Sequence, residues 1–374
     1  MFRGILQPLA ATRLANILHH LPNPTFLAIT TATMKEAIVR KGTNIEIVDS
    51  PVPKPSKGQV LIKVVYSGSN PKDWKYPELV KEGETNQGDD IAGTIHEVGD
   101  GVSEFKVGDR VTAFHQMLSP GGSYAEYALA WASTTAYLPS NIGFKEGAAL
   151  PLASLTAAIG LYERLRLPQP WTPRADTDAP LPLVIYGASS SIGYYALQFA
   201  IKSNIHPLIC VAGKAAAHVE KVIDRSKGDT IVDYRGGDEA VQSGIKDALK
   251  GAELHYAFDG VSEKGSYQNI CKVIAKGGHV TLVLPGRKYD DIPEGVKQTI
   301  TMVGDVHGPH KEFGYVYYRY IALGVEQGWF KPQPQEEIPG GLNGVQEGLR
   351  NLKEGKASAV KYVFKIADTP GAGQ

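Results

Sequence analysis

The stretch LVIYGASSSIGYYALQFAIKSN, residues 183–204, combines three local signals in one continuous unit. Its first four residues form an apolar run, which is typical of a strand buried on both faces of a sheet. Its last 13 residues carry apolar side chains at helical spacing. The turn between them consists of small residues, which let a ligand approach the backbone at the start of the helix. We therefore predict a strand, a phosphate-binding turn and a helix.

The start of this helix favours an anion, because its first N–H groups are unpaired and the helix dipole is positive there. The pyrophosphate of a dinucleotide is the ligand that this arrangement predicts. A plain tight turn needs the same small residues and is the alternative interpretation. The candidate cofactor-binding residues of the turn are Gly187, Ala188, Ser189, Ser190, Ser191, Ile192 and Gly193.

Strand-like and helical segments alternate after this turn. This alternation is the pattern of a doubly wound parallel sheet, so we predict an α/β cofactor-binding domain over residues 166–310. The further strand-like segments are LICVAG (208–213), TIVDY (230–234), LHYAFDG (254–260), HVTLVLPG (279–286) and TITMVGDV (299–306).

The earlier part of the chain has a different pattern. From residue 34 to about residue 114, short β-branched runs are broken by Gly, Pro, Asn and Asp, which predicts an antiparallel, barrel-like sheet. A helix is expected at about 145–165. We predict a catalytic domain over residues 34–165, and we expect a helix and a strand within residues 311–374 to return to it.

The composition restricts the partners of the protein. Lys plus Arg equals Asp plus Glu at 39 each, and no basic run is interleaved with aromatic residues, so nucleic acid is not an expected partner. No apolar stretch reaches the ~20 residues of a membrane helix, which predicts a soluble protein. The two cysteines, Cys210 and Cys271, lie in apolar segments and are expected to be buried thiols.

Residues 1–33 form an N-terminal extension with its own character. They contain arginines but no acidic residue, and their leucines follow the spacing of an amphipathic helix. This profile is typical of a mitochondrial presequence, although serine is scarce. The alternatives are a disordered tail or translation from Met34. The expected location is therefore cytoplasmic or mitochondrial.

The end of the second predicted strand bears on cofactor choice. NAD-selective sites usually carry Asp or Glu about 20 residues after the first glycine, where the carboxylate binds the ribose hydroxyls. Here that region ends in Gly213 and Lys214, and a lysine would attract a 2′-phosphate. Tyr234, at the end of the next strand, is a candidate for the adenosine end. NADPH is the predicted cofactor, although Lys214 could simply be solvated and Tyr234 a strand-end core residue.

With these segments in place, the chain resembles the medium-chain dehydrogenase/reductase superfamily over residues 34–367. It is similar above all to the zinc-free quinone oxidoreductases and the fungal trans-acting enoyl reductases. The resemblance implies a GroES-like β-barrel catalytic domain and a Rossmann cofactor domain, with hydride transfer as the reaction. Besides the phosphate turn, the matching motifs are GDRV (108–111), GGSYAEY (121–127) and EGAALPLASLTA (146–157).

Many members of the superfamily are zinc alcohol dehydrogenases, so the metal ligands need to be compared. A catalytic zinc requires three good protein ligands and one open position. Here the segment SGSNP (67–71) replaces the family's cysteine, and GDDI (88–91) replaces its His-Glu pair. The resemblance therefore implies no metal site. Asp89 and Asp90 are expected to be solvated or capping groups, and His115 is expected to be structural.

The segment NPKDWK (70–75) is similar to the NPxDxK pattern of zinc-free fungal relatives. The resemblance implies that Asn70 and Lys75 lie beside the nicotinamide as catalytic donors, with Asp73 on the cofactor side. It also places Thr156 at the nicotinamide half, unless that threonine bonds its own helix. Further candidates are Ser358, which would close over the cofactor, and Tyr76 and Tyr124 as proton donors, for which core packing is the alternative.

We therefore expect an NADPH-dependent, zinc-independent oxidoreductase that transfers hydride to an activated C=C bond or a quinone. Without zinc, hydrogen-bond donors must stabilise the developing negative charge, which suits conjugated acceptors. An aldehyde or carbonyl reductase is the nearest alternative. A catalytically idle NADPH-binding sensor or carrier-protein partner is the alternative of another class. The expected substrate is a small enone, quinone or aldehyde, and the expected state is a monomer or a homodimer.

Overall fold

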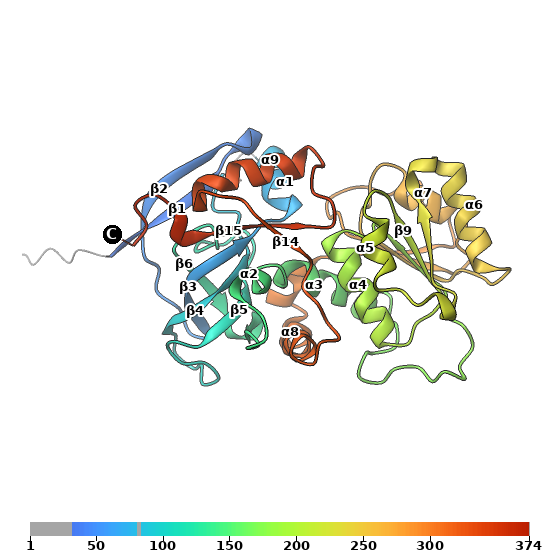
Figure 1. The fold of residues 1–374 in the computed structure, drawn as a ribbon, viewed down its shortest axis with the longest axis horizontal. Helices are drawn as coiled ribbons and strands as arrows, with labels where there is room; N and C mark the ends of the chain where they lie inside the picture. The colour runs from blue at the N-terminus through green and yellow to red at the C-terminus, as the bar shows by residue number, and fades with distance from the viewer. Residues whose placement is uncertain (1–31, 81–83, 374) are drawn as a thin grey trace, which may run out of the picture. The chain divides into compact units, whose positions relative to one another are not determined.

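The structure is a computed structural model that describes residues 32–80 and 84–373. The predicted presequence lies outside the described residues, apart from its last two positions. Two large sheets and a two-stranded ribbon organise the described part (Figure 1). No helix within it combines the length and the apolar character that crossing a membrane requires.

Six strands form a parallel sheet in the order β10-β9-β8-β11-β12-β13. The order reverses direction between β8 and β11, and ligands of such sheets bind at this switch point. The prediction of a doubly wound α/β sheet is therefore confirmed. The strands are β8 Leu183–Tyr186, β9 Leu208–Ala212, β10 Thr230–Asp233, β11 Tyr256–Asp259, β12 His279–Leu282 and β13 Lys297–Ile300.

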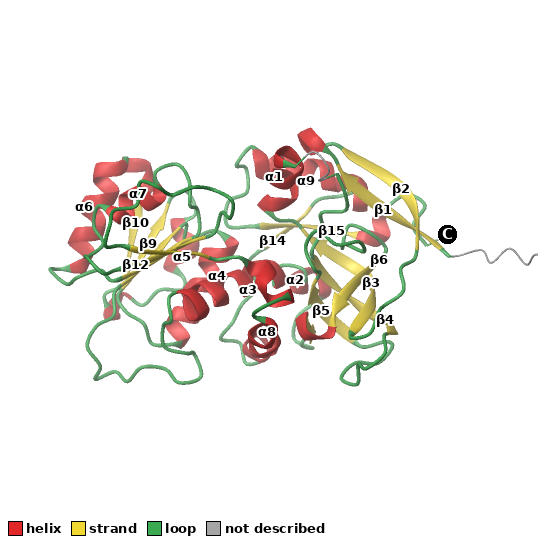
Figure 2. Cartoon of the chain, turned by 180° about the vertical axis from the view of Figure 1, so that it is seen from behind, coloured by secondary structure: helices red, strands yellow, loops and turns green. Residues whose placement is uncertain are grey.

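Helices cover both faces of the parallel sheet (Figure 2). Because strand side chains alternate between faces, Leu183 and Ile185 of β8 join one apolar cluster and Val184 and Tyr186 join another. The first cluster includes side chains of α4 and of α8, and the second includes those of α6 and α7. The helices are α4 Ser191–Lys202, α6 Asp238–Leu249, α7 Ser266–Cys271 and α8 Lys311–Glu326, with the short α5 Ala216–Glu220 after β9.

The second sheet is mainly antiparallel and has the order β14-β15-β3-β4-β5-β7, with β6 paired to β3. Its C-terminal strand β15 pairs antiparallel with β3, and β14 runs parallel to β15. The last strands of the chain thus lie in the sheet that the early strands build. The strands are β3 Gln59–Gly68, β4 Asp90–Val98, β5 Arg110–Phe114, β6 Tyr127–Trp131, β7 Thr135–Tyr137, β14 Gln335–Glu337 and β15 Lys361–Lys365; β1 Thr33–Val39 and β2 Ile45–Pro51 form the ribbon.

The predicted continuous helix at about 145–165 is wrong in detail. The structure has α2 Phe144–Gly147, a break, and then α3 Pro151–Ala158, which continues as a π-helical turn over Ile159–Arg164. Proline is suited to the first position of a helix because it has no N–H to pair, so Pro151 starts a new helix. Two further helices complete the elements used below: α1 Pro71–Leu79 and α9 Val345–Lys353.

Candidate active site

The phosphate turn is a close-packed junction between β8 and α4. Gly187 has φ +77°, and a Cβ on Gly193 would lie 2.3 Å from the carbonyl oxygen of Gly187. Both positions therefore need glycine. Ser190 caps α4, because its Oγ accepts a hydrogen bond from the Gly193 N–H at 3.1 Å. Ser191 is the first residue of α4.

Several groups of this turn are available to a ligand. Ser190 is exposed, and Ser189, Ser191 and Ile192 are half-buried. The N–H groups in the first turn of a helix have no helical carbonyl partner, so those of Ser191 and Ile192 are suited to an anion. Ala188 differs, because it is buried and its N–H bonds to the Val211 carbonyl at 3.0 Å. Its N–H is therefore bonded within the protein, and its predicted contact with the cofactor stays a prediction.

A residue that the sequence did not single out supports this turn. Gln333 is fully buried, and its Nε2 donates to the carbonyl oxygen of Ser189 at 3.3 Å. The Gln333 N–H also donates to the Tyr195 hydroxyl at 3.0 Å. The segment between α8 and β14 therefore runs beside the phosphate turn and holds one of its peptide groups.

The ends of β9 and β10 lie side by side. A Cβ on Gly213 would lie 2.5 Å from Cε1 of Tyr234, so the glycine makes room for the aromatic ring. Tyr234 is 50% exposed and Lys214 is exposed. Lys214 forms no ion pair with any carboxylate in the described part of the chain, whereas Arg235 is paired with Asp233. The structure thus places an unpaired cation and an exposed ring at the edge predicted to bind the adenosine end.

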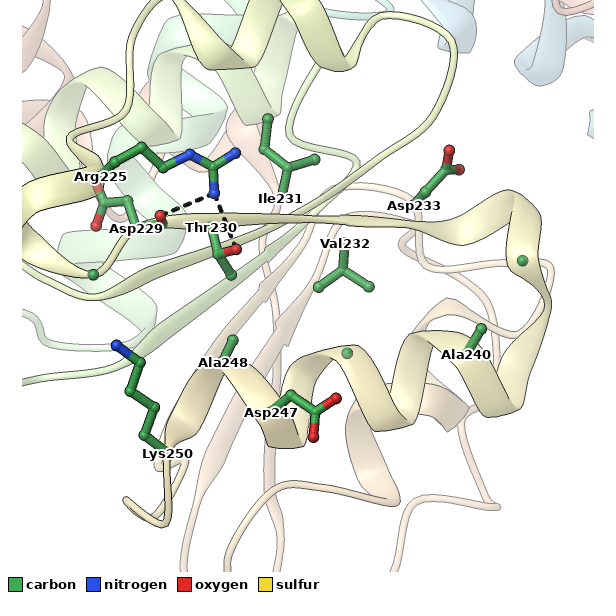
Figure 3. Close-up of a pocket in the computed structure, with 13 residues that line it drawn as sticks. Arg225, Asp229, Thr230, Ile231, Val232, Asp233, Ala240, Asp247, Ala248 and Lys250 are labelled. Atoms are coloured by element: carbon green, nitrogen blue, oxygen red, sulfur yellow. Dashed lines mark hydrogen bonds between the residues drawn. The ribbon is translucent and has the colours of Figure 1, made fainter.

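A groove of about 720 Å³ lies elsewhere, between β10 and α6 (Figure 3). Arg225 lines it and donates to the Asp229 carbonyl at 3.2 Å and to Thr230 Oγ1 at 3.0 Å. No residue of the phosphate turn lines this groove. It therefore lies outside the predicted cofactor site.

The NPKDWK segment forms the start of α1. The Asn70 N–H donates to Asp73 Oδ2 at 2.7 Å, and the Tyr124 hydroxyl donates to the same oxygen at 2.6 Å. Asp73 and Tyr124 are fully buried, and burial raises the pKa of both groups, that of Asp73 to about 6. Asp73 caps α1 and Tyr124 holds that cap, so the structure gives both a structural role. Their predicted contacts with cofactor or substrate stay predictions.

Asp90 is the centre of a buried polar cluster that we call the Asp90 hub, made of Asn70, Asp90, Leu152 and Lys361. Lys361 Nζ lies 2.6 Å from Asp90 Oδ2, and the Asn70 Nδ2 donates to that oxygen at 2.9 Å. The other carboxylate oxygen accepts the Leu152 N–H at 2.7 Å, at the start of α3. Lys361 Nζ also donates to Asn70 Oδ1 at 2.7 Å. The hub joins α1, β4, β15 and α3.

Asp89 is buried next to this hub and has its own lysine. Lys72 Nζ lies 2.5 Å from Asp89 Oδ2 and donates to the Gln87 carbonyl at 2.6 Å. Burial raises the pKa of Asp89. The expectation that Asp89 and Asp90 are solvated is wrong, because they are 1% and 0% exposed. The capping alternative holds for Asp90, which caps α3.

The remaining predicted residues differ in accessibility. Lys75 and Glu263 form an ion pair at 3.2 Å, with side chains 25% and 33% exposed. Thr156 is buried, and its Oγ1 donates to the Leu152 carbonyl at 2.7 Å, which is the bond to its own helix that the alternative described. Ser358 is exposed in the segment between α9 and β15. Lys75 is thus the accessible catalytic candidate.

Comparison with known proteins identifies the family. The alcohol dehydrogenase GroES-like domain family matches residues 56–140. The trans-enoyl reductase fsr4 of Gibberella fujikuroi is 54% identical over 315 residues, which span 84% of this chain and 93% of that protein. The chain belongs to the medium-chain dehydrogenase/reductase superfamily. It falls in the branch of the fungal enoyl reductases, as predicted.

Solved structures agree with this superfamily assignment at the level of the fold. The CurK enoyl reductase has a TM-score of 0.70 at 18% identity and covers 88% of this chain and 98% of its own. An alcohol dehydrogenase superfamily protein from Novosphingobium aromaticivorans has a TM-score of 0.72 at 20% identity, with 89% and 100% covered. The GroES-like and Rossmann fold class is therefore confirmed.

As a member of this superfamily, the protein is an oxidoreductase with a nicotinamide cofactor, and its residues fit that group. The glycines at 187 and 193 leave no room for side chains, the first turn of α4 presents N–H groups, and the turn lies at the switch point of the sheet.

The described residues hold no cluster of three His, Cys, Asp or Glu side chains at metal-binding distance. Sequence reasoning missed Lys361, Gln333 and Glu263, which no local motif marks.

Proposed function

We propose that this protein is an NADPH-dependent, zinc-independent enoyl reductase that delivers hydride to a C=C bond conjugated to a carbonyl. The observation that carries the proposal is how lysines pair with carboxylates around residues 67–71 and 88–91, the segments that replace the metal ligands of zinc relatives. Lys72 and Lys361 are paired with the buried carboxylates of Asp89 and Asp90, whereas the partner of Lys75 is Glu263, whose side chain is 33% exposed. Such a site supplies an ammonium to a substrate and has no ligand set for a metal.

The preference for NADPH rests on the ends of β9 and β10. Lys214 is exposed and unpaired within the described residues, and it stands where NAD-selective sites carry an acid. A free ammonium attracts the 2′-phosphate, while a carboxylate would repel it. Tyr234 offers its exposed ring beside Gly213. These features favour the phosphorylated dinucleotide.

The chain's own residues account for the remaining chemistry. The bound cofactor supplies the hydride. Lys75 donates a hydrogen bond from Nζ to the carbonyl oxygen of the substrate and stabilises the negative charge that grows there as the β-carbon accepts hydride. Asn70, at the start of α1, is the second proposed hydrogen-bond donor. Asp90 and Lys361 fix the position of its side-chain amide. The resulting enolate takes up one proton, which completes the reduction of the double bond.

The relative fsr4 carries the name trans-enoyl reductase, which favours the enoyl acceptor over the quinone and aldehyde alternatives. The test compares NADPH consumption with a 2-enal, the matching saturated aldehyde and a quinone, with identification of the products. We expect the saturated aldehyde as the product of the 2-enal and no turnover of that aldehyde. Turnover of the saturated aldehyde alone would contradict the proposal. Metal analysis of the active protein should give well under one zinc per chain.

A further inference from the structure

Glu263 lies in a loop with an unusual backbone. Its neighbours on both sides, Ser262 and Lys264, have positive φ values of 57° and 55°, and Gly265 follows with φ 84°. Residues other than glycine adopt this region at a cost and keep it only where the surrounding structure enforces it. The conformation that presents Glu263 is therefore imposed on the loop.

The enforcing contacts come from Asp259 at the end of β11. This buried carboxylate accepts hydrogen bonds from the N–H groups of Val261 and Ser262, both at 2.9 Å, and from Ser266 Oγ at 2.6 Å. The Ser262 hydroxyl donates to the Asp259 carbonyl at 2.9 Å and accepts the Val283 N–H at 2.8 Å. Hydrogen bonds thus hold the loop at Val261 and Ser262 before Glu263 and at Ser266 after it.

The loop also lies at the cofactor edge of the parallel sheet. β11 is the neighbour of β8 across the switch point. A Cβ on Gly187 would lie 2.7 Å from Cγ2 of Val261, so the loop packs directly on the phosphate turn. Glu263 follows two residues later and pairs with Lys75 of α1. The pair therefore connects the helix that carries the predicted donor with the loop beside the cofactor site.

We propose that Glu263 is a positioning residue that holds the Lys75 ammonium beside the dinucleotide site. Lysine has four rotatable bonds, and a single carboxylate on a rigid loop limits the positions that its ammonium can take. Glu263 acts on turnover through Lys75, without contacting the reacting atoms. This inference rests on the enoyl reductase function and on the catalytic role of Lys75 proposed above.

The test is a double-mutant cycle on the full chain with NADPH and a 2-enal. Glu263→Gln keeps the shape of the side chain and removes its charge. We expect kcat to fall about fivefold, the factor that a partly exposed ion pair supplies, with KM for NADPH nearly unchanged. In the Lys75→Ala background, the same change should have no further effect. Glu253→Gln is the matched control, because Glu253 pairs with His255 at 3.2 Å on the surface, and kcat should stay the same.

The outcomes separate this inference from the proposed function. An unchanged or raised kcat in Glu263→Gln, with Lys75→Ala strongly impaired, overturns the positioning role alone. An equal loss in both backgrounds also overturns it, since Glu263 would then act independently of Lys75. A Lys75→Ala variant with unaffected turnover removes the catalytic role of Lys75 instead. Thermal unfolding of each variant checks that all the proteins compared are folded. We expect all of them to fold, because the Lys75–Glu263 pair is partly exposed.

Discussion

Four lysines of this protein fall into two groups that differ in what surrounds the ammonium. Lys361 and Lys72 form ion pairs with the buried carboxylates of Asp90 and Asp89. Lys75 and Lys214 are accessible, one in a partly exposed pair and the other with no carboxylate partner in the described residues. The comparison indicates that the two lysines paired with buried carboxylates hold the site together, while Lys75 and Lys214, whose ammonium groups have no buried carboxylate partner, are the ones proposed to bind ligands. Variants of the two groups should therefore fail in different ways.

The largest effect is expected on stability, at Lys361. Lys361→Met leaves the Asp90 carboxylate buried without its cation, and losing one partner of a buried pair costs about 3–5 kcal/mol. Denaturant unfolding measures this loss. The double variant Lys361→Met with Asp90→Asn is the control, because it removes the stranded charge, keeps an oxygen that can accept the Leu152 N–H, and should recover most of the stability. A Lys361→Met variant as stable as the parent would mean that the hub is not structural.

The next largest effect is expected on catalysis, at Lys75. Lys75→Ala removes one charge-stabilising donor, which should lower kcat for a 2-enal by about 10²-fold. Its unfolding free energy should change by less than about 1 kcal/mol, since a partly exposed ion pair contributes little. Steady-state kinetics and denaturant unfolding on the same sample check both parts. If Lys75→Ala lost as much stability as Lys361→Met, the two groups of lysines would not differ in their structural role.

A smaller and more selective effect is expected at Lys214. Lys214→Glu places a carboxylate where the 2′-phosphate is predicted to bind, which should raise KM for NADPH by about tenfold or more. KM for NADH should change little, because that cofactor has no 2′-phosphate. Turnover at saturating cofactor should be retained. Equal effects on both dinucleotides would remove Lys214 from phosphate recognition.

The sequence predicted the parts of the site that are continuous along the chain. The turn of residues 187–193 lies between a strand and a helix within one 22-residue stretch, so local patterns were sufficient. Lys75 could be singled out only because its motif resembles that of relatives. The support of these residues could not be predicted in the same way. Asn70 and Lys361 are 291 residues apart and Lys75 and Glu263 are 188 apart, so only the folded sheets bring them together.

Burial also changes the interpretation of residues that the sequence singles out. Asp89 and Asp90 look like solvated acids in a glycine-rich loop, but the Asp90 hub and Lys72 enclose them. The resemblance places Thr156 at the nicotinamide half of the cofactor, whereas its hydroxyl bonds within α3. A motif gives the identity and order of residues, whereas their hydrogen-bond partners depend on which distant strands pack against them.

The smallest effect is expected on cofactor affinity, at Gln333, whose neutral side chain supports the phosphate turn without an ion pair. Gln333→Met keeps the length of the side chain and removes its hydrogen bond to the Ser189 carbonyl, so one peptide of the phosphate turn loses its support. A single neutral hydrogen bond contributes about 1 kcal/mol, which predicts a rise of about fivefold in the dissociation constant. The rise should be the same for NADPH and NADH, since both carry the pyrophosphate, and titration by cofactor fluorescence measures it. Gln335→Met is the nearby control, because the Gln335 side chain bonds the Gln333 carbonyl and, among the described residues, forms no hydrogen bond to the turn. A selective loss of NADPH binding would place Gln333 with Lys214 and would show that the turn holds its shape without this bond.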